Sequence, residues 1–594
     1  MSVVALFSLY ALGISSDNSG GFNPVFTPPK IKLPMKILMI SPEIAPYSKT
    51  GGLGDAVAAL TKAVAERGHE VRVFTPLYGS VKRVGEWTPY PDPVRVELGF
   101  GMYADCRVWE VPFHKAQIEF CEYNHFFGAP EVYSQRKDDA YRFAFFCRAA
   151  IDFCEQSNWI PDIVHCHDWT TGLVPAMLNT RDNWRRIARA GTVFTIHNLQ
   201  HQGLCEKGII DYLGLPWGLF TDDNYECLGG LNMMKGALYH STKITTVSPT
   251  YAYEIQTPQY GFGIDHVLRH RSRDLTGIIN GIDYQEWSPL VDKYIPAHYN
   301  ADDFTGKRIC KAELQKACGL PVKENVPVFG VVSRLYDQKG LDLFAGILPE
   351  LLSRAEMQVV LLGSGDPALE SAFGRLAASF PSKMYARIGY DNKLSHMIEA
   401  GSDFFVMPSR FEPCGLNQMY SMAYGTLPIV RTTGGLVDTV AAWTPKAPGQ
   451  GTGINFQDAD QQALLWAIER ALQLYYDYSS DYYAVRRNAM CRDFSWDRSV
   501  DKYEEVYQSA LEMRKGAFPP PPKLVKQEPK PVPPVEKDPV ALPPPAVEPS
   551  PVPVEKPAEQ LSAKPKTEKK PVGTKPATVK SVPAKKSKKS PRKK

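Results

Sequence analysis

Two series of alternating strand-like and helix-like segments dominate the body of this chain. In the first series, hydrophobic runs at Lys36–Ile40 and Val71–Phe74 flank Asp55–Arg67, where apolar residues recur at helical spacing. Another strand pattern follows at Asp162–His165, and the alternation starts again near Pro327. Strands joined by helices pair in parallel and are covered on both faces. The pattern therefore predicts an α/β protein with two doubly wound, Rossmann-like domains.

The second series is at least as regular as the first. It predicts strands at Val328–Val332, Gln358–Leu362, Met384–Ile388 and Phe404–Met407 and helices at Leu341–Leu352 and Ala368–Ala377. We expect domains at residues 35–285 and 286–495, facing a central cleft, with a further helix at 496–515. Ligands of open α/β sheets bind at the carboxyl ends of the strands, so the cleft is the expected site.

The two ends of the chain differ from its body. Of 50 prolines, 21 lie between Pro519 and Pro591, and from Pro519 onward 18 lysines and arginines face 7 acidic residues. We expect residues 516–594 to be a disordered basic tail. The excess of lysine and arginine in this tail is the source of the net charge of +4 of the whole chain. Such a tail favours solubility; nucleic acid is an unlikely partner, except through weak electrostatic contact. Residues 1–34 precede a compact strand start at Met35 and are interpreted as an extension, either untranslated or for targeting.

Cysteine usage and hydropathy constrain the compartment. The 11 cysteines are scattered and form no C-x-x-C pair, which indicates a reducing environment without structural zinc. No apolar run is long enough for a bilayer, so no membrane partner is expected. A cytoplasmic location is predicted, with a plastid as the alternative in a eukaryote.

The segment Lys49-Thr50-Gly51-Gly52-Leu53-Gly54-Asp55 joins the first strand to the first helix. Glycines allow the backbone to approach a phosphate, the helix start presents amides to it, and Lys49 adds a full positive charge. This predicts an anion-binding loop for a nucleotide-linked substrate. The alternative is a glycine-rich turn with a solvated lysine.

The strand pattern Asp162–His165 ends in His165-Cys166-His167-Asp168-Trp169. Carboxylate and imidazole groups hydrogen-bond sugar hydroxyls, and an indole packs against a sugar ring, so sugar recognition is the favoured interpretation. A zinc site would need a third ligand at a suitable spacing, and a buried structural histidine is the other alternative.

Polar residues also follow three strands of the second series. Arg334 and Lys339 come after the first of them and would hold a departing diphosphate. Glu412 follows the strand Phe404–Met407, beside the predicted helix Leu416–Tyr424. A second glycine loop, Thr433-Gly434-Gly435, follows the strand Leu427–Val430. Surface salt bridging is the alternative for the cations.

Together these motifs resemble the bacterial glycogen synthase and plant-type starch synthase family, retaining glucosyltransferases of glycosyltransferase family 5 with the GT-B fold. The resemblance spans Met35 to about Met513. Its further motifs are Phe194–Gly203, Val247–Tyr251 and Ile279–Asp283. It also implies that the last predicted helix, Val500–Met513, crosses back to the first domain.

The resemblance implies a role for each matching residue. It assigns catalysis to Glu412, His167, Arg334 and Lys339. It assigns substrate binding to Lys49, Gly51, Gly52, Asp55, Asp138, Asn198, Tyr390, Cys414, Gly415, Thr433, Gly434 and Gly435. No metal and no cofactor are implied; Asp458-Ala459-Asp460 resembles a metal-binding D-x-D but is interpreted as a helix cap.

The implied reaction transfers glucose from ADP-glucose to the non-reducing end of an α-1,4-glucan with retention of configuration. A UDP-glucose-dependent enzyme of the same fold and a non-catalytic glucan-binding scaffold are the alternatives. Glu412 is followed eight residues later by Tyr420 rather than by a second glutamate. This argues against the GT-B group that is marked by two glutamates.

Overall fold

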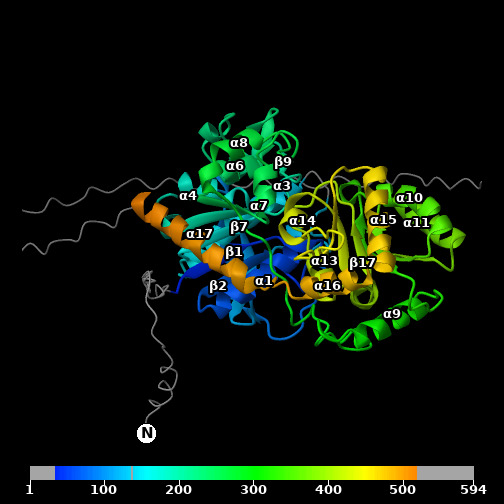
Figure 1. Cartoon of the computed structure of the whole chain (residues 1–594). Helices are drawn as coiled ribbons and strands as arrows, with labels where there is room; N and C mark the ends of the chain where they lie inside the picture. The colour runs from blue at the N-terminus through cyan, green and yellow to red at the C-terminus, as the bar shows by residue number, and fades with distance from the viewer. Residues whose placement is uncertain (1–33, 135–137, 518–594) are drawn as a thin grey trace, which may run out of the picture. The chain divides into compact units, whose positions relative to one another are not determined.

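The computed structural model describes residues 34–134 and 138–517 (Figure 1). The extension predicted for residues 1–34 therefore lies outside the described residues, apart from its last position. The disordered tail predicted for 516–594 also lies outside them, apart from its first two positions.

Ten strands of the described residues form the first sheet, in the order β13-β12-β8-β7-β1-β2-β6-β5-β3, with β4 paired to β5. Their bounds are β1 Lys36–Ile40, β2 Glu70–Pro76, β3 Thr88–Pro89, β4 Val94–Glu97, β5 Tyr103–Phe113, β6 Ala116–Glu122, β7 Ile163–His167, β8 Gly191–Ile196, β12 Lys243–Thr246 and β13 Leu275–Gly277. The expected parallel pairing holds from β13 to β6. It fails beyond β6, because β5 turns back in a hairpin at Phe113–Ala116 and pairs antiparallel with β6, β4 and β3.

The helices of this domain follow or lie between its strands along the chain. They are α1 Gly52–Glu66, α2 Asn124–Phe127, α3 Asp139–Gln156, α4 Val174–Asn179, α5 Gly208–Leu213, α6 Met233–His240, α7 Pro249–Glu254 and α8 Asp265–His270. Helix α1 buries Val57, Leu60 and Val64, the apolar positions that predicted it. The 3₁₀ turn Trp169–Thr171 separates β7 from α4. A small sheet of β9 Leu204–Cys205, β10 Glu226–Cys227 and β11 Gly230–Asn232 lies apart from the main one.

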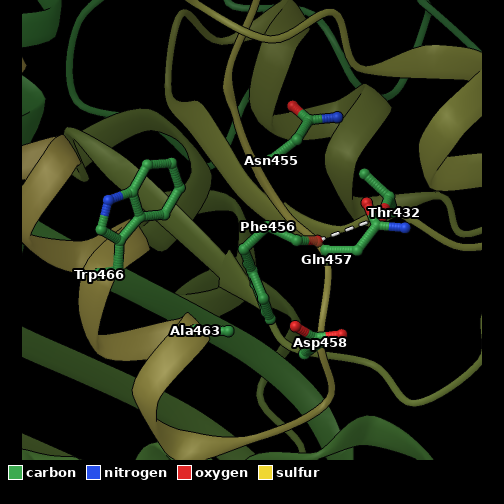
Figure 2. Close-up of a pocket in the computed structure, with 7 residues that line it drawn as sticks. All are labelled: Thr432, Asn455, Phe456, Gln457, Asp458, Ala463 and Trp466. Carbon is green, nitrogen blue, oxygen red and sulfur yellow. Dashed lines mark hydrogen bonds between the residues drawn. The ribbon is translucent and has the colours of Figure 1, made fainter.

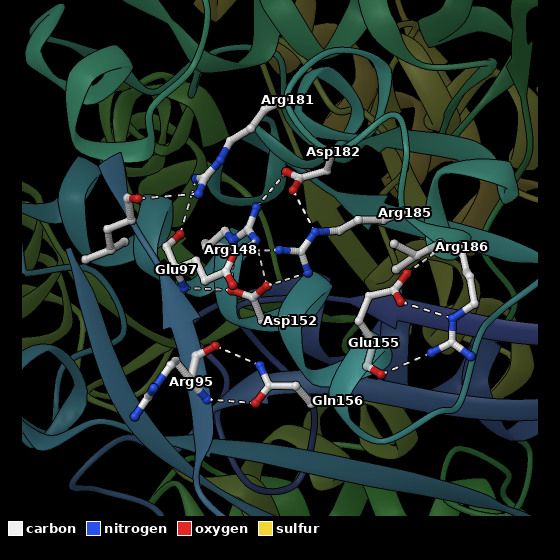
Figure 3. Close-up of polar contacts among 12 residues, drawn as sticks. Arg95, Glu97, Arg148, Asp152, Glu155, Gln156, Arg181, Asp182, Arg185 and Arg186 are labelled. Carbon is white, nitrogen blue, oxygen red and sulfur yellow. Dashed lines mark hydrogen bonds and ion pairs between the residues drawn. The ribbon is translucent and has the colours of Figure 1, made fainter. Parts of the chain in front are cut away.

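Helix α3 carries charges into the interior of this domain (Figure 3). The guanidinium of Arg148, which is fully buried, contacts Asp152 at 2.6 Å and Asp182 at 2.6 Å. Arg185 contacts Asp152 at 3.0 Å and Asp182 at 2.9 Å. Removing one partner from such a network would leave a buried charge uncompensated. The network therefore ties α3 to the segment after α4.

The second sheet is parallel throughout its described strands, in the order β16-β15-β14-β17-β18-β19. Its strands are β14 Val328–Leu335, β15 Gln358–Gly365, β16 Met384–Ile388, β17 Phe404–Met407, β18 Leu427–Arg431 and β19 Ile454–Phe456. Its helices are α9 Thr305–Ala317, α10 Leu341–Arg354, α11 Pro367–Ser379, α12 Asn392–Gly401, α13 Asn417–Ala423, α14 Gly434–Thr439, α15 Gln461–Asp477 and α16 Ser479–Met490. Asp460 accepts a hydrogen bond from the amide of Ala463 at 2.8 Å and so caps α15, as the sequence predicts.

The last helix, α17 Trp496–Ala517, follows the second domain in sequence but packs against the first (Figure 1). Its residue Ala510 lies so close to Gly191 of β8 that a Cβ on the glycine would be 2.9 Å from the Ala510 carbonyl carbon. The hydroxyl of Ser499 donates to the carbonyl of Ile279 at 2.5 Å. Close backbone packing therefore holds α17 on the first sheet.

Candidate active site

The loop between β1 and α1 presents Lys49 beside Asp55. The Lys49 ammonium lies 2.8 Å from both carboxylate oxygens of Asp55, and 43% of the Lys49 side chain is exposed. Burial opposes the charge, but Asp55 outweighs it and raises the pKa of Lys49, with smaller contributions from Tyr390 and Glu286. Gly52 begins α1, and a Cβ there would meet Leu416 of the second domain at 3.7 Å. The predicted anion-binding loop therefore faces the second domain with its cation held by a carboxylate.

Glu43 organises this loop, and the sequence analysis missed it. Its carboxylate accepts the amide of Thr50 at 2.6 Å, the hydroxyl of Thr50 at 2.8 Å and the hydroxyl of Tyr133 at 2.8 Å. Only 2% of Glu43 is exposed. A carboxylate directly after Pro42, at the carboxyl end of a buried strand, is the signal that could have identified it.

The histidines at the end of β7 form a buried cluster with His197. Nδ1 of His167 lies 3.0 Å from Nε2 of His197, and the rings of His165 and His167 are 4.1 Å apart. Within the described residues, Nε2 of His167 has no hydrogen-bond partner. Burial lowers the pKa of His165 and of His197 to about 3, and that of His167 well below its usual value. The cluster is therefore neutral, and His167 offers one free nitrogen to a ligand.

Asp168, next in the chain, holds the backbone of the neighbouring loop. Its Oδ1 accepts the amides of His197 at 2.7 Å and Asn198 at 3.4 Å. It has φ of 57°, an uncommon conformation for a non-glycine residue. Burial raises its pKa to about 7. The structure thus gives Asp168 a supporting role that the sequence did not specify.

In the second domain, Lys339 and Glu412 form a direct ion pair. The ammonium of Lys339 lies 2.6 Å from Oε2 of Glu412, and the hydroxyl of Ser409 donates to the same oxygen at 3.0 Å. Side-chain exposure is 20% for Lys339 and 6% for Glu412. Gly340 has φ of 62°, and a Cβ there would come 2.0 Å from the carbonyl oxygen of Pro408, so only glycine allows these two loops to touch. Two predicted residues, 73 positions apart, are thus brought together.

The second glycine loop packs on the backbone of Glu412. The amide of Gly435 donates to the carbonyl of Glu412 at 3.1 Å, and a Cβ on Gly434 would lie 2.0 Å from that oxygen. The hydroxyl of Thr433 and the amide of Gly434 both donate to Glu254 of the first domain, each at 3.0 Å. Groups of this loop, which is predicted to bind substrate, are therefore hydrogen-bonded to other parts of the protein in this structure.

The remaining predicted residues occupy more varied positions. Arg334 is the penultimate residue of β14, with its guanidinium 5.8 Å from the ring of Tyr336. After burial, Arg334 is the second cause of the lowered pKa of His201. Tyr390 follows β16, is 74% exposed and donates to Asn392 at 2.8 Å.

The other five predicted positions lie on loops or at helix starts, and Gly51 immediately precedes α1. Asp138 immediately precedes α3, and Asn198 accepts the amide of Gln200 at 3.0 Å. Cys414 is buried, which raises the pKa of its thiol to about 12, and Gly415 has φ of 72°.

A separate hollow of about 450 Å³ lies at the edge of the second sheet, where Thr432 bonds Gln457 and Trp466 of α15 is half exposed (Figure 2). It contains none of the predicted site residues. Among residues 34–134 and 138–517, no group of three or more histidine, cysteine or acidic side chains is arranged to hold a metal ion. In the same residues, no helix combines the length and apolar character needed to span a bilayer.

Comparisons with known proteins agree with this geometry. A sequence model described as "Starch synthase catalytic domain" matches residues 36–270, and one described as "Glycosyl transferases group 1" matches residues 316–487. The glycogen synthase of Anaeromyxobacter sp. (strain Fw109-5) is 47% identical over 485 residues, which cover 80% of this chain and 99% of that protein. The chain belongs to the glycogen synthase and starch synthase family.

Other members of the family show the same likeness. Glycogen synthase 1 of Geobacter sulfurreducens is 43% identical over 492 residues, 81% of this chain and 97% of that protein. The catalytic domain of starch synthase IV from Arabidopsis thaliana, solved with ADP and acarbose, superposes with a TM-score of 0.76 at 35% identity, covering 81% of this chain and all of that one. The protein is therefore a glucosyltransferase with the two-domain GT-B fold that the sequence predicts.

Proposed function

We propose that this protein transfers glucose from ADP-glucose to the non-reducing-end 4-hydroxyl of an α-1,4-glucan with retention of configuration. The observation that carries the proposal is the Lys339–Glu412 pair, at 2.6 Å, beside the carboxyl ends of β14 and β17. The bound ADP and acarbose of starch synthase IV support an adenine nucleotide and an α-glucan as ligands.

In the proposed reaction, the bond from glucose C1 to the diphosphate breaks while the acceptor oxygen bonds to C1 on the same face. The hydroxyl proton passes to the departing diphosphate. Arg334, Lys339 and Lys49 neutralise the charge that develops on the diphosphate, which is worth most in a site that excludes water. Donor binding would exchange the carboxylate partners of the two lysines for phosphate oxygens.

The first domain supplies the sugar contacts in this proposal. The neutral His167 presents its free Nε2 to a glucose hydroxyl, with Asp138 and Asn198 nearby in the same role. Tyr390 packs against the base, and the glycine loops frame the diphosphate. Glu412 supports the positively charged transition state electrostatically. We assign the domains to residues 35–285 and 286–495, and the crossing helix to 496–515.

The deciding experiment incubates the full chain with a maltooligosaccharide and either radiolabelled ADP-glucose or radiolabelled UDP-glucose, and then sizes the products. ADP-glucose is expected to give longer chains that an α-1,4-specific hydrolase degrades. Faster extension from UDP-glucose would overturn the donor assignment. No extension from either donor would overturn the proposed function. The weak contact of the tail with nucleic acid and the cytoplasmic location stay predictions.

A further inference from the structure

Helices α7 and α14 belong to different domains and bind each other reciprocally. Oε1 of Glu254, the last residue of α7, accepts the hydroxyl of Thr433 and the amide of Gly434, at the start of α14. In the opposite direction, the carboxylate of Asp438 near the end of α14 accepts the amide of Thr250 at 2.9 Å and its hydroxyl at 2.7 Å, at the start of α7. Each helix therefore provides a capping carboxylate to the other, in addition to the Ser248 side chain that already caps α7.

This arrangement satisfies groups that a helix cannot satisfy by itself. The first amides of a helix have no partner within it, and a carboxylate near them is favourable. At α14, the residue before the helix, Thr433, makes no side-chain cap to its own helix. The carboxylate of Glu254 takes that place from the other domain, and Thr433 is fully buried beneath the contact.

The contact continues from Glu254 to the ion pair of the active site. Gly434 bonds Glu254, and the next amide, that of Gly435, donates to the carbonyl of Glu412 at 3.1 Å and to that of Pro413 at 3.2 Å. The Glu412 side chain in turn bonds Lys339. Since a Cβ on Gly434 would collide with the Glu412 carbonyl, the loop and the Glu412 backbone are in close contact and cannot move independently.

We propose that Glu254 is a positioning residue, which holds the Thr433–Gly435 loop, and through it Glu412, in the arrangement that glucosyl transfer needs. Glu254 touches no reacting atom in this role. The reciprocal Asp438–Thr250 bonds keep α7 in place to do so. The inference rests on the proposed role of Glu412.

The geometry defines which property of Glu254 matters. Both hydrogen bonds end on the same oxygen, Oε1, while Oε2 has no hydrogen-bond partner among the described residues. A glutamine retains one such oxygen, loses the charge and places an NH2 group where Oε2 has no hydrogen-bond partner. Glu254→Gln should therefore preserve the positioning, and Glu254→Ala should abolish it.

The test compares these two variants in the full chain with a saturating maltooligosaccharide. Glu254→Ala is expected to lower kcat by about tenfold. Such a decrease corresponds to an increase in the activation free energy that equals the net contribution of about one hydrogen bond. The KM for the glucan and the melting temperature should change little, and Glu254→Gln should regain most of the lost kcat. Lys62→Ala is the matched control, because Lys62 bonds Asp283 at 2.9 Å without touching the loop, and its kcat should equal that of the wild type.

Three outcomes would overturn the proposal. An unchanged kcat in Glu254→Ala would remove the positioning role. A higher kcat or a lower donor KM would show that the carboxylate obstructs the loop instead. A Glu254→Gln variant as slow as Glu254→Ala would show that the charge, not the oxygen, is what acts.

A second measurement separates this proposal from the proposed reaction. Amide hydrogen exchange of the peptide spanning Ser409–Gly415 needs no substrate. It should be faster in Glu254→Ala than in Glu254→Gln or Lys62→Ala. Equal exchange rates in the three variants would overturn the positioning role of Glu254, even if the wild type transfers glucose. If the wild type transfers no glucose, the exchange rates can still be compared, because this measurement does not depend on activity.

Discussion

The two sides of the site use different electrostatics. On the first domain, His165 and His167 are buried and His197 is half-buried, and desolvation lowers the pKa of all three, which keeps them neutral. On the second, Lys339 and Glu412 are charged residues in contact, at the end of a wholly parallel sheet. A neutral, hydrogen-bonded wall suits the uncharged glucose, and a charged wall suits the diphosphate. In the proposed reaction, the neutral histidines would contact the sugar, while Lys339, together with the first domain's Lys49, would stabilise the leaving group.

The largest effect is expected on the charged side. Lys339→Ala should lower kcat by about two to three orders of magnitude, because it removes a donor aimed at charge that develops in the transition state. The melting temperature should also fall, because Glu412 is nearly buried and loses its ion-pair partner. Steady-state kinetics and calorimetry measure the two effects.

The control for that prediction is Lys316→Ala, which breaks an exposed ion pair with Glu313 on α9 and should alter neither quantity. If Lys339→Ala keeps the turnover of the wild type, the charged side of the site in the second domain does not contribute to the reaction as proposed.

On the neutral side, the expected effect appears in the pH dependence of stability. A histidine whose pKa is lowered on folding binds a proton more readily when unfolded, so folding stability falls as pH drops below about 6.5 and levels off near the folded value. With a folded pKa of about 3, His165 should cost about 2 kcal/mol between pH 7 and pH 5. Urea unfolding of His165→Asn should lose about this much of the wild-type pH dependence.

The exposed His270 offers a matched control for that measurement, since His270→Asn should keep the wild-type pH dependence. A His165→Asn variant with the full wild-type dependence would mean that the cluster is not kept neutral by the fold.

Tyr390 should show a smaller effect, confined to donor binding. It is 74% exposed, so Tyr390→Ala should leave stability unchanged and raise the donor KM by about tenfold through lost stacking. A binding assay with ADP alone measures this directly. If kcat falls instead and ADP affinity is retained, Tyr390 acts on the reaction rather than on the base.

The sequence predicted the second domain better than the first, and the reason is physical. The strand Phe404–Met407 is bounded as predicted, because parallel strands buried on both faces are continuous apolar runs. The half-exposed strand β5 alternates irregularly and was not predicted. The hairpin of β5 and β6 depends on pairing between the two segments, and their sequences show no common hydrophobic pattern that would predict this pairing.

The same distinction applies to the site. Lys339 and Glu412 could be singled out because charged residues on strand-to-helix loops follow directly after a strand, and the structure places the two in contact. Glu43 and Glu254 were missed, because Glu43 also bonds Tyr133, 90 positions away, and Glu254 bonds groups in the other domain. Only the folded chain brings those groups together.

The smallest effect is expected for a substitution in α17 that contacts the histidine cluster of the first domain. The hydroxyl of Tyr507 lies 2.9 Å from Nδ1 of His165, whose Nε2 lies 2.6 Å from the hydroxyl of Thr195. Tyr507→Phe removes one buried hydrogen bond and leaves the packing in place, so it should lower the free energy of unfolding by about 1 kcal/mol. Because the rings of His165 and His167 are in contact, a loss of kcat by about twofold is also expected. Tyr476→Phe, which loses an exposed hydrogen bond to Glu356, should leave kcat unchanged. If Tyr507→Phe lowers stability but not kcat, α17 supports the fold of the first domain without influencing the orientation of His167.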